Sequence, residues 1–147
     1  MINAYGKDDI LFGARDHDFL YGGGGRDILV GGIGADVLQG DAGKDTMIGG
    51  FGGDRFVFAA RSDSGIGTST SDVIVGFDAD LGDRIYLRAI GLVEFIGDLA
   101  FSGVGQVRIG TKGSFVTIEV NDNDDNLPDM IILLEGLVTF SSSALLI

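Results

Sequence analysis

The chain has 147 residues, a formal net charge of −12 and no cysteine. The acidity disfavours nucleic acid and anionic membrane surfaces as partners and favours cations. The absence of cysteine excludes disulfides and thiolate metal sites, and no apolar run reaches the ~18 residues needed to span a bilayer.

The residue composition predicts an all-β protein with many turns. The chain has 26 glycines, and 19 of its 22 acidic residues are aspartate. Aspartate suits turns and the coordination of hard cations, whereas glutamate, which occurs only three times, suits helices. The N-terminal segment MINAYGKDDI has no basic region followed by an apolar stretch, so no N-terminal secretory signal peptide is predicted.

Six nine-residue repeats run in phase from residue 4 to residue 57. The sixth position is always aspartate: Asp9, Asp18, Asp27, Asp36, Asp45 and Asp54. The eighth position is always large and apolar: Leu11, Leu20, Leu29, Leu38, Met47 and Phe56. Glycine fills the first position from the second repeat onward and the fourth position in the last four repeats. A glycine-rich linker would not keep a phased apolar column, so the repeat indicates a folded unit.

Each repeat predicts a turn followed by a short strand. The first six residues form the turn, because glycine permits positive φ and lets carbonyl groups face inward. The last three residues form a strand whose middle residue points into the core. Two repeats, 18 residues, make one coil. Stacked coils give a right-handed parallel β-roll.

Stacking places the aspartates in two rows, one along each edge of the roll. Asp9, Asp27 and Asp45 fall on one edge, which leaves the other three aspartates on the opposite edge. Neighbours in a row are about 4.8 Å apart, where bare carboxylates repel each other. A Ca²⁺ ion between two turns reverses that repulsion, because it binds roughly six to eight oxygens that carboxylates and turn carbonyls can supply.

We expect about four calcium ions, each between one turn and the turn two ahead. The metal-binding residues are predicted to be the six aspartates together with Gly22, Gly23, Gly25, Gly31, Gly32, Gly34, Gly40, Gly43, Gly49, Gly50 and Gly52. The pairs 22–27 with 40–45 and 31–36 with 49–54 are expected to form the best sites. The pairs 4–9 with 22–27 and 13–18 with 31–36 are expected to be weaker or absent, because Lys7 and Asp16 replace the fourth glycine.

The repeat is similar to G-G-x-G-x-D-x-U-x, the calcium-binding nonapeptide of RTX (repeats-in-toxin) proteins. Residues 22–57 match this pattern closely, and residues 4–21 match it in a degenerate form. The resemblance implies a calcium-loaded β-roll in an extracellular protein that is secreted without an N-terminal signal peptide.

The chain after the repeats predicts further strands over 72–78, 83–87, 106–109, 114–120 and 129–136, which are β-branched runs bounded by Gly, Asp and Ser. This segment resembles the region that follows the RTX repeats in serralysin-type metalloproteases and related type I-secreted proteins. The resemblance implies a roll over 1–60 and an antiparallel β cap over 61–147 that carries a type I secretion signal. The sequence departs from that family at Tyr86, where aspartate is usual, and in the final SSSALLI, which lacks an acidic residue.

Catalytic motifs are missing from the sequence. The only histidine, His17, lies in a degenerate turn and is expected to be exposed, so the zinc-binding HExxH of serralysins is absent. No G-x-S-x-G elbow and no cysteine nucleophile are present. The chain is therefore predicted not to be an enzyme. The acidic run at 121–126 predicts a solvated hairpin turn, with an additional weak cation site as the alternative.

One outward face of the roll is continuously apolar, with Ile10, Phe12, Ile28, Val30 and Ile48. An isolated soluble roll should avoid such a face. We expect it to be covered by the C-terminal strands, by an upstream domain or by a second copy of the chain. Tolerated exposure of scattered apolar residues is the alternative.

These features favour a calcium-binding C-terminal module of a type I-secreted bacterial exoprotein that folds on calcium after export. Its expected partners are calcium, an upstream catalytic or adhesive domain and the type I secretion apparatus. The alternative is a carbohydrate-binding module for uronate polymers, like the RTX modules attached to alginate epimerases, with Arg26 and Lys44 as the contacting cations. A third possibility is an adhesin fragment that self-associates through its apolar face.

Overall fold

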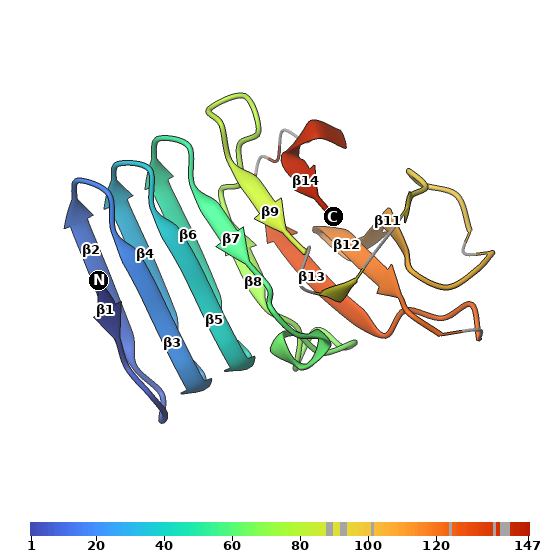
Figure 1. Cartoon of the computed structure of the whole chain (residues 1–147), viewed down its shortest axis with the longest axis horizontal. Coiled ribbons are helices and arrows are strands. Elements are labelled where there is room, and N and C mark those ends of the chain that lie inside the picture. Colours follow the sequence, from blue (N-terminus) through green and yellow to red (C-terminus); the bar gives the residue numbers. More distant parts are fainter. Residues whose placement is uncertain (88–89, 92–93, 101, 124, 137, 139–141) are drawn as a thin grey trace.

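The computed structural model describes residues 1–87, 90–91, 94–100, 102–123, 125–136, 138 and 142–147. Its strands form two sheets that face each other along the molecule (Figure 1). Within the described residues there is no α-helix, and short 3-10 helices include η1 (Arg61–Asp63) and η3 (Ser142–Ala144). No described helix is long and apolar enough to cross a bilayer.

The first sheet, sheet A, runs in the order β1 (Ile2–Asn3), β3 (Phe19–Gly25), β5 (Val37–Gly43), β7 (Arg55–Val57), β9 (Arg84–Tyr86) and β14 (Leu145–Leu146). Sheet B runs in the order β10 (Glu94–Phe95), β11 (Gln106–Lys112), β12 (Phe115–Asn121), β13 (Met130–Glu135), β8 (Val73–Val75), β6 (Thr46–Phe51), β4 (Ile28–Ile33) and β2 (Ile10–Arg15). Successive strands of the repeats alternate between the sheets, so each coil contributes one strand to each. The expected all-β class and parallel β-roll are confirmed.

In the roll, each strand pairs with the strand one coil away, so that equivalent positions of the repeats lie side by side. Leu11 pairs with Leu29 and Leu29 with Met47 in sheet B, while Leu20, Leu38 and Phe56 align in sheet A. All six of these eighth-position side chains are buried. The interior of the roll is therefore a stack of in-register apolar residues, as the repeat predicts.

Both sheets continue past the last repeat. In sheet B, β8 pairs in parallel with β6, and β13 in turn pairs in parallel with β8. In sheet A, β9 pairs in parallel with β7 and β14 with β9. The two expected units, 1–60 and 61–147, thus share both sheets. The C-terminal segment adds strands to each sheet at the end of the last repeat.

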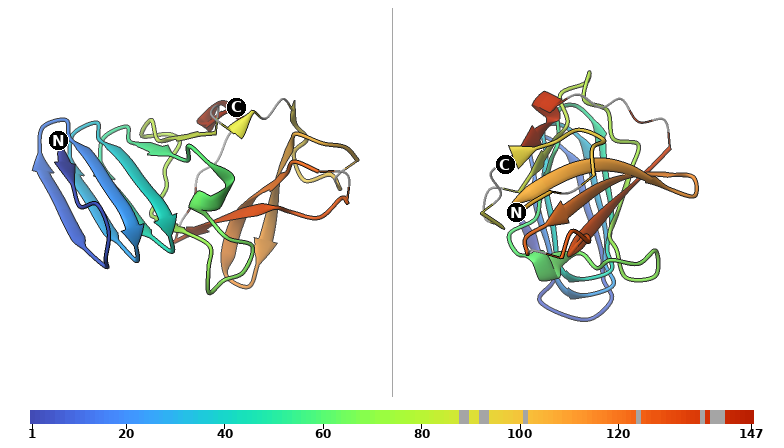
Figure 2. Two further views of the ribbon diagram at one scale, coloured as in Figure 1. Left: turned by 60° about the horizontal axis from the view of Figure 1, so that its bottom comes forward. Right: turned by 90° about the vertical axis from the view of Figure 1, so that its right-hand side faces the viewer.

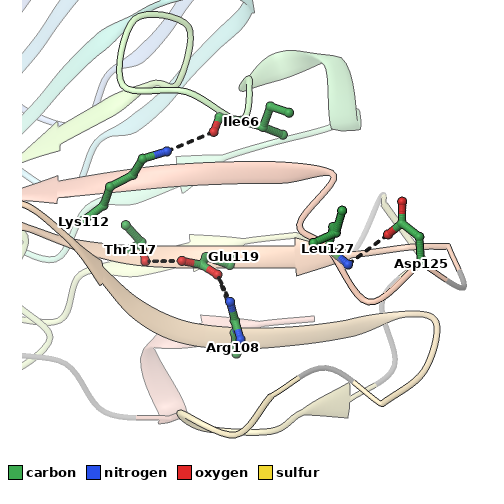
Figure 3. A network of polar contacts seen from close by, with 7 residues as sticks. All are labelled: Ile66, Arg108, Lys112, Thr117, Glu119, Asp125 and Leu127. Atoms are coloured by element: carbon green, nitrogen blue, oxygen red, sulfur yellow. Dashed lines mark hydrogen bonds and ion pairs between the residues drawn. The ribbon is translucent and has the colours of Figure 1, made fainter.

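The C-terminal part adds an antiparallel arrangement at the end of sheet B. Strands β11, β12 and β13 are antiparallel neighbours (Figure 2), and all five strands expected after the repeats are present. Their inward residues, such as Ile118 and Met130, belong to the same hydrophobic core as the roll. On the outside, Lys112 Nζ donates a hydrogen bond of 3.2 Å to the carbonyl oxygen of Ile66, which ties the β11–β12 hairpin to the 64–71 loop (Figure 3).

The apolar face of the first coil is not covered by the C-terminal strands. Ile10 and Phe12 on β2 are 63% and 64% exposed, and Ile28 on β4 is also exposed. Of the three covers expected for this face, the C-terminal strands are the wrong one for Ile10, Phe12 and Ile28, because those strands lengthen sheet B. Cover by an upstream domain or by a second copy stays a prediction. Only near the far end does a second small cluster form outside the sheet, around Val73, Ile131 and Leu133.

Candidate metal centre

All six turns of the repeats share positive φ angles at the same two positions. The second and fourth positions of each turn have positive φ, from +64° at Asp41 to +153° at Gly43. In the last four repeats glycine occupies seven of these eight positions, and in the first two repeats the positions are filled by Tyr5, Lys7, Ala14 and Asp16. Such a conformation costs an L-residue about 1–2 kcal/mol, so the degenerate turns are formed against local strain.

The fourth-position glycines also let neighbouring coils approach closely. A Cβ atom on Gly43 would overlap the carbonyl oxygen of Gly25, and one on Gly52 would overlap that of Gly34. Stacking therefore requires glycine here for space as well as for φ. The carbonyl groups of Gly25 and Gly34 therefore lie directly against the glycine at the same position of the following coil.

The aspartates form two hydrogen-bonded ladders along the edges. From the second coil onward, the Oδ1 atom of each repeat aspartate accepts a hydrogen bond from the backbone N–H of the aspartate one coil earlier, at 2.8 Å. The ladders are Asp9 to Asp27 to Asp45 on one edge and Asp18 to Asp36 to Asp54 on the other. The sixth-position aspartates thus lie in two rows, one along each edge of the roll.

The second carboxylate oxygen has no partner. The Oδ2 atoms of Asp27, Asp36, Asp45 and Asp54 are buried without a hydrogen bond. Each lies beside the first-position glycine of its own turn, where a Cβ atom would touch it. At Gly22 that same Cβ position is 2.8 Å from the carbonyl oxygen of Gly40, one coil ahead. The absence of a side chain at this glycine therefore leaves a small space between coils, which we call a cradle. It is lined by a carboxylate oxygen without a hydrogen bond and by a carbonyl oxygen.

The electrostatics of the cradles are unfavourable without a cation. Burial raises the pKa of Asp45 and Asp54 to about 6, against the lowering effect of the backbone hydrogen bonds that they accept. The neighbouring carboxylates of Asp27 and Asp83, respectively, raise these two pKa values further. Burial also raises the pKa of Asp27. A hard divalent cation would remove the penalty, because it supplies the opposite charge and accepts oxygen ligands.

The donor set fits calcium. No group of three or more acidic or histidine side chains converges within the described residues, so a bound ion would draw many of its ligands from backbone carbonyls. Calcium accepts such mixed carboxylate and carbonyl shells. In the first coil Asp9 and Asp18 are only half-buried, and Asp18 lies 3.8 Å from the N-terminal amine. The expectation that the first coil holds the weaker sites remains a prediction.

Two residues outside the predicted set continue the ladders. Asp72 Oδ1 accepts a hydrogen bond from the N–H of Asp45 at 2.9 Å, and Asp83 Oδ1 accepts one from the N–H of Asp54 at 2.8 Å. Asp72 keeps the nine-residue spacing, which is the signal that could have identified it. Asp83 is out of phase, and its only sequence signal is its place directly before a short apolar strand.

The remaining candidates have structural roles. His17 is exposed, as expected, and its Nδ1 accepts a hydrogen bond from the N–H of Ala35 in the next coil. In the 121–126 loop, Asn123 Oδ1 accepts from the N–H of Asp125, and Asp122 forms an ion pair with Arg61. Asp124 lies outside the described residues. The described side chains of this loop thus stabilise a turn between β12 and β13.

Comparison with known proteins agrees with this geometry. A family model described as the RTX calcium-binding nonapeptide repeat matches in four copies over residues 2–29 and 21–56. The solution structure of the AlgE6R3 subunit from the Azotobacter vinelandii mannuronan C5-epimerase is similar, with a TM-score of 0.69 and 32% identity over 95% of this chain and 78% of that one. The AlgE6R2 subunit of the same enzyme has a TM-score of 0.70 and 29% identity, over 95% of this chain and 88% of that one.

No curated protein sequence matches the chain. The family model identifies calcium-binding repeats, and the two solved structures have a similar fold along nearly the whole chain. The chain belongs to the RTX family of calcium-binding nonapeptide-repeat proteins.

Proposed function

We propose that the chain is a non-catalytic module whose repeat turns bind calcium and fold around it. The observation that supports this most directly is the row of buried Oδ2 atoms without partners at Asp27, Asp36, Asp45 and Asp54. A buried carboxylate oxygen without a hydrogen bond is costly, and the same atom is a good calcium ligand. The aspartates and glycines predicted from the repeat would line these sites.

The proposed sites number about four, with turns 22–27, 31–36, 40–45 and 49–54 forming the best two. In these turns the first and fourth positions are all glycine, and their aspartates are at most 1% exposed. Four divalent ions would add eight positive charges to a chain whose net charge is −12. Much of the self-repulsion of the folded state would then disappear.

Calcium would act as a folding switch by mass action. An ion that binds only the folded turns stabilises the folded state in proportion to the logarithm of its concentration. At low calcium the charged ladders oppose folding, and the chain stays open and suited to passage through an exporter. At high calcium outside the cell the roll forms, which agrees with the extracellular setting typical of RTX proteins.

We further propose that residues 61–147 carry a type I secretion signal and that a catalytic or adhesive domain lies upstream. Support for the signal is the resemblance to the segment after the repeats in serralysin-type proteins. In the folded chain the tail strand β14 pairs with β9, so its backbone is engaged in sheet A. An exporter would therefore meet this tail before folding is complete.

A calcium titration tests the folding switch. CaCl₂ is added to EDTA-stripped protein while far-UV circular dichroism follows the β signal and calorimetry counts the ions, with MgCl₂ as the control. We expect a cooperative gain of β structure with calcium alone. A fully folded metal-free protein that takes up no calcium would contradict the proposal.

A second candidate function is binding of a uronate polymer. Both solved relatives are subunits of a mannuronan C5-epimerase, and sheet A of this chain places a cation beside an aromatic ring. Arg55 lies in register with Arg84, and its guanidinium carbon is 5.8 Å from the centre of the Tyr86 ring. Of the two cations suggested by the sequence, Arg26 is exposed, whereas Lys44 donates a hydrogen bond to the carbonyl oxygen of Thr68.

Calorimetry with oligomannuronate in saturating calcium tests this candidate. Measurable binding that weakens in the Arg55→Ala variant, but not in Lys7→Ala on an exposed turn, would support a uronate-binding face. No heat from the wild-type chain would leave the calcium-dependent folding module as the better description.

A further inference from the structure

The first coil (residues 4–21) differs from the later coils at the fourth position of its two turns. In the turns of the later coils this position is always glycine: Gly25, Gly34, Gly43 and Gly52. In the first coil it is Lys7, at φ +112°, and Asp16, at φ +74°. L-residues rarely adopt such φ values, so the first coil keeps two strained residues where the rest of the roll has glycine.

The fourth-position glycines of the later coils lie directly against the coil before. A Cβ atom on Gly25 would overlap the carbonyl oxygen of Lys7, and one on Gly34 would overlap that of Asp16. The same overlap occurs at both fourth positions of the third coil. The obstructing atoms belong to the backbone, so they cannot turn aside as the end of a flexible side chain would. A coil that carries a side chain at this position therefore cannot stack on a coil in front of it.

Lys7 and Asp16 lie at the front of the roll, where the described chain forms no earlier full coil. β1 and β2 are the outermost strands of sheets A and B, and they lie together at one end of the molecule (Figure 1). The register at this end is already that of the repeats, since Ile2 on β1 pairs with Leu20 one coil later. A further coil in this register would bring its fourth-position carbonyl oxygens onto the Cβ atoms of Lys7 and Asp16.

Side chains of the first coil also bind the second coil directly. Asp8 Oδ1 accepts a hydrogen bond from the N–H of Arg26 at 2.8 Å, and His17 Nδ1 accepts one from the N–H of Ala35 at 2.7 Å. Both acceptors stand at the fifth position of their turns, where the later coils have arginine, alanine, lysine and glycine. None of those residues has a side-chain acceptor, so hydrogen bonds of this kind are particular to the first coil. The first coil is thus adapted to pack on one side only.

We propose that the first coil terminates the roll, with Lys7 and Asp16 preventing any further coil of this repeat from stacking on β1 and β2. The exclusion applies equally to repeats upstream in the same polypeptide and to a second roll. An open sheet edge otherwise accepts additional strands, and arrays of repeats require an atypical repeat at each end. The inference goes beyond calcium binding, because the obstacle is steric. It makes the roll a folding unit of fixed length, whose response to calcium is independent of any repeats in front of it.

Duplication of a coil tests this inference. Residues 22–39 form the complete second coil, and a second copy of them is inserted at one of two repeat boundaries in the full chain. One insertion lies ahead of the first coil, between Asn3 and Ala4, and the other lies inside the roll, between Gln39 and Gly40. In saturating calcium, hydrogen exchange with intact-protein mass spectrometry counts the slowly exchanging amides, and calorimetry counts the calcium ions.

The internal copy should stack as an additional coil, adding slowly exchanging amides and bound calcium. The same copy ahead of the first coil should add neither, and Lys7→Gly with Asp16→Gly should restore both. Tyr5 and Ala14 stay unchanged in that variant, because Asp41 shows that the second position accepts a side chain inside the roll. Equal protection of the two copies without these substitutions would overturn the inference, and so would a forward copy that stays unprotected after them.

The reverse substitution covers the case in which an inserted coil fails to fold at either boundary. Gly25→Lys with Gly34→Asp moves the same two side chains one coil later, in the chain without an insertion. We expect residues 4–21 to lose their amide protection while residues 40–57 keep theirs. Hydrogen exchange on proteolytic peptides reads both segments in one sample.

The matched control places lysine and aspartate one residue further on, at the exposed fifth positions, as Arg26→Lys with Ala35→Asp. This control should keep the protection of residues 4–21. Wild-type protection of that segment in the variant with Gly25→Lys and Gly34→Asp would refute the inference. A wild-type chain that bound no calcium would contradict the proposed function and leave this comparison of amide protection in place.

Discussion

The repeats and the C-terminal segment build the same two sheets but stabilise their buried polar groups in different ways. In the repeats, a row of carboxylates keeps one oxygen each without a partner. In the C-terminal segment, Glu119 accepts two hydrogen bonds from the guanidinium of Arg108, at 2.8 and 2.6 Å, and one from Thr117 (Figure 3). The second region supplies its own counter-charge, and the first requires one from solution. Calcium dependence should therefore be concentrated in the roll.

Removal of calcium should produce the largest difference in stability between the two regions. With EDTA, amide hydrogens of the repeat strands should exchange quickly, because the ladders then repel without a counter-ion. The hairpin β11–β12 should lose less protection. Hydrogen exchange read by mass spectrometry measures both regions in one sample, and equal loss throughout would show that the chain responds as a single unit.

The pH should change the stability of the metal-free roll in a defined direction. Burial raises the pKa of Asp45 and Asp54 to about 6 and that of Asp72 to about 8. A carboxyl with a raised pKa binds its proton more tightly in the folded state, so this stabilisation is complete below the ordinary value of 3.8 and is lost as the pH rises through about 6 and about 8.

In EDTA, the thermal midpoint should therefore be higher at pH 5 than at pH 7.5. Saturating calcium should abolish or reverse that order, because the ion replaces the proton. Thermal melts in four buffers, with and without calcium, make the comparison. A metal-free protein that is more stable at pH 7.5 would show that these carboxylates are not the dominant groups.

Glycine-to-alanine substitutions should cost more stability where the glycine contacts the neighbouring coil than where it faces open space. Gly43→Ala puts a Cβ against the carbonyl of Gly25 at φ +153°, so we expect a loss of more than about 2 kcal/mol. Gly113→Ala, at φ +65° with no atom within 4 Å of the added Cβ, should cost about 1 kcal/mol from φ strain alone. Denaturant melts in saturating calcium measure both, and similar losses would mean that coil contact does not restrict Gly43.

The contribution of the C-terminal ion pair to stability should not depend on calcium. Arg108→Ala leaves the buried Glu119 without its guanidinium, at a cost of about 1–3 kcal/mol. Lys112→Ala, which removes one surface hydrogen bond, should stay within about 0.5 kcal/mol. Urea melts at two calcium concentrations test this, and a cost for Arg108→Ala that varies with calcium would show that the regions are coupled.

Much of the candidate site could be predicted from the sequence because the repeat is local and periodic. The aspartates, the positive-φ glycines and the inner apolar column all follow from one nine-residue pattern. Asp72 also keeps that spacing, but without a glycine turn before it the sequence does not reveal that it joins a ladder. Asp83 loses the spacing as well, since the segment between β8 and β9 has its own length.

The sequence by itself determined the coil, its register and its two rows of carboxylates. An 18-residue period allows only one stacking that keeps the eighth-position Leu, Met and Phe of every repeat inside. Only the tertiary structure decided how the stack ends, because that depends on contacts between distant segments, such as the hydrogen bond from Ser64 to Ile131, 67 residues apart. It also decided that the last strands lengthen the sheets and leave Ile10 and Phe12 exposed, since strand pairing there competes with covering an outer face.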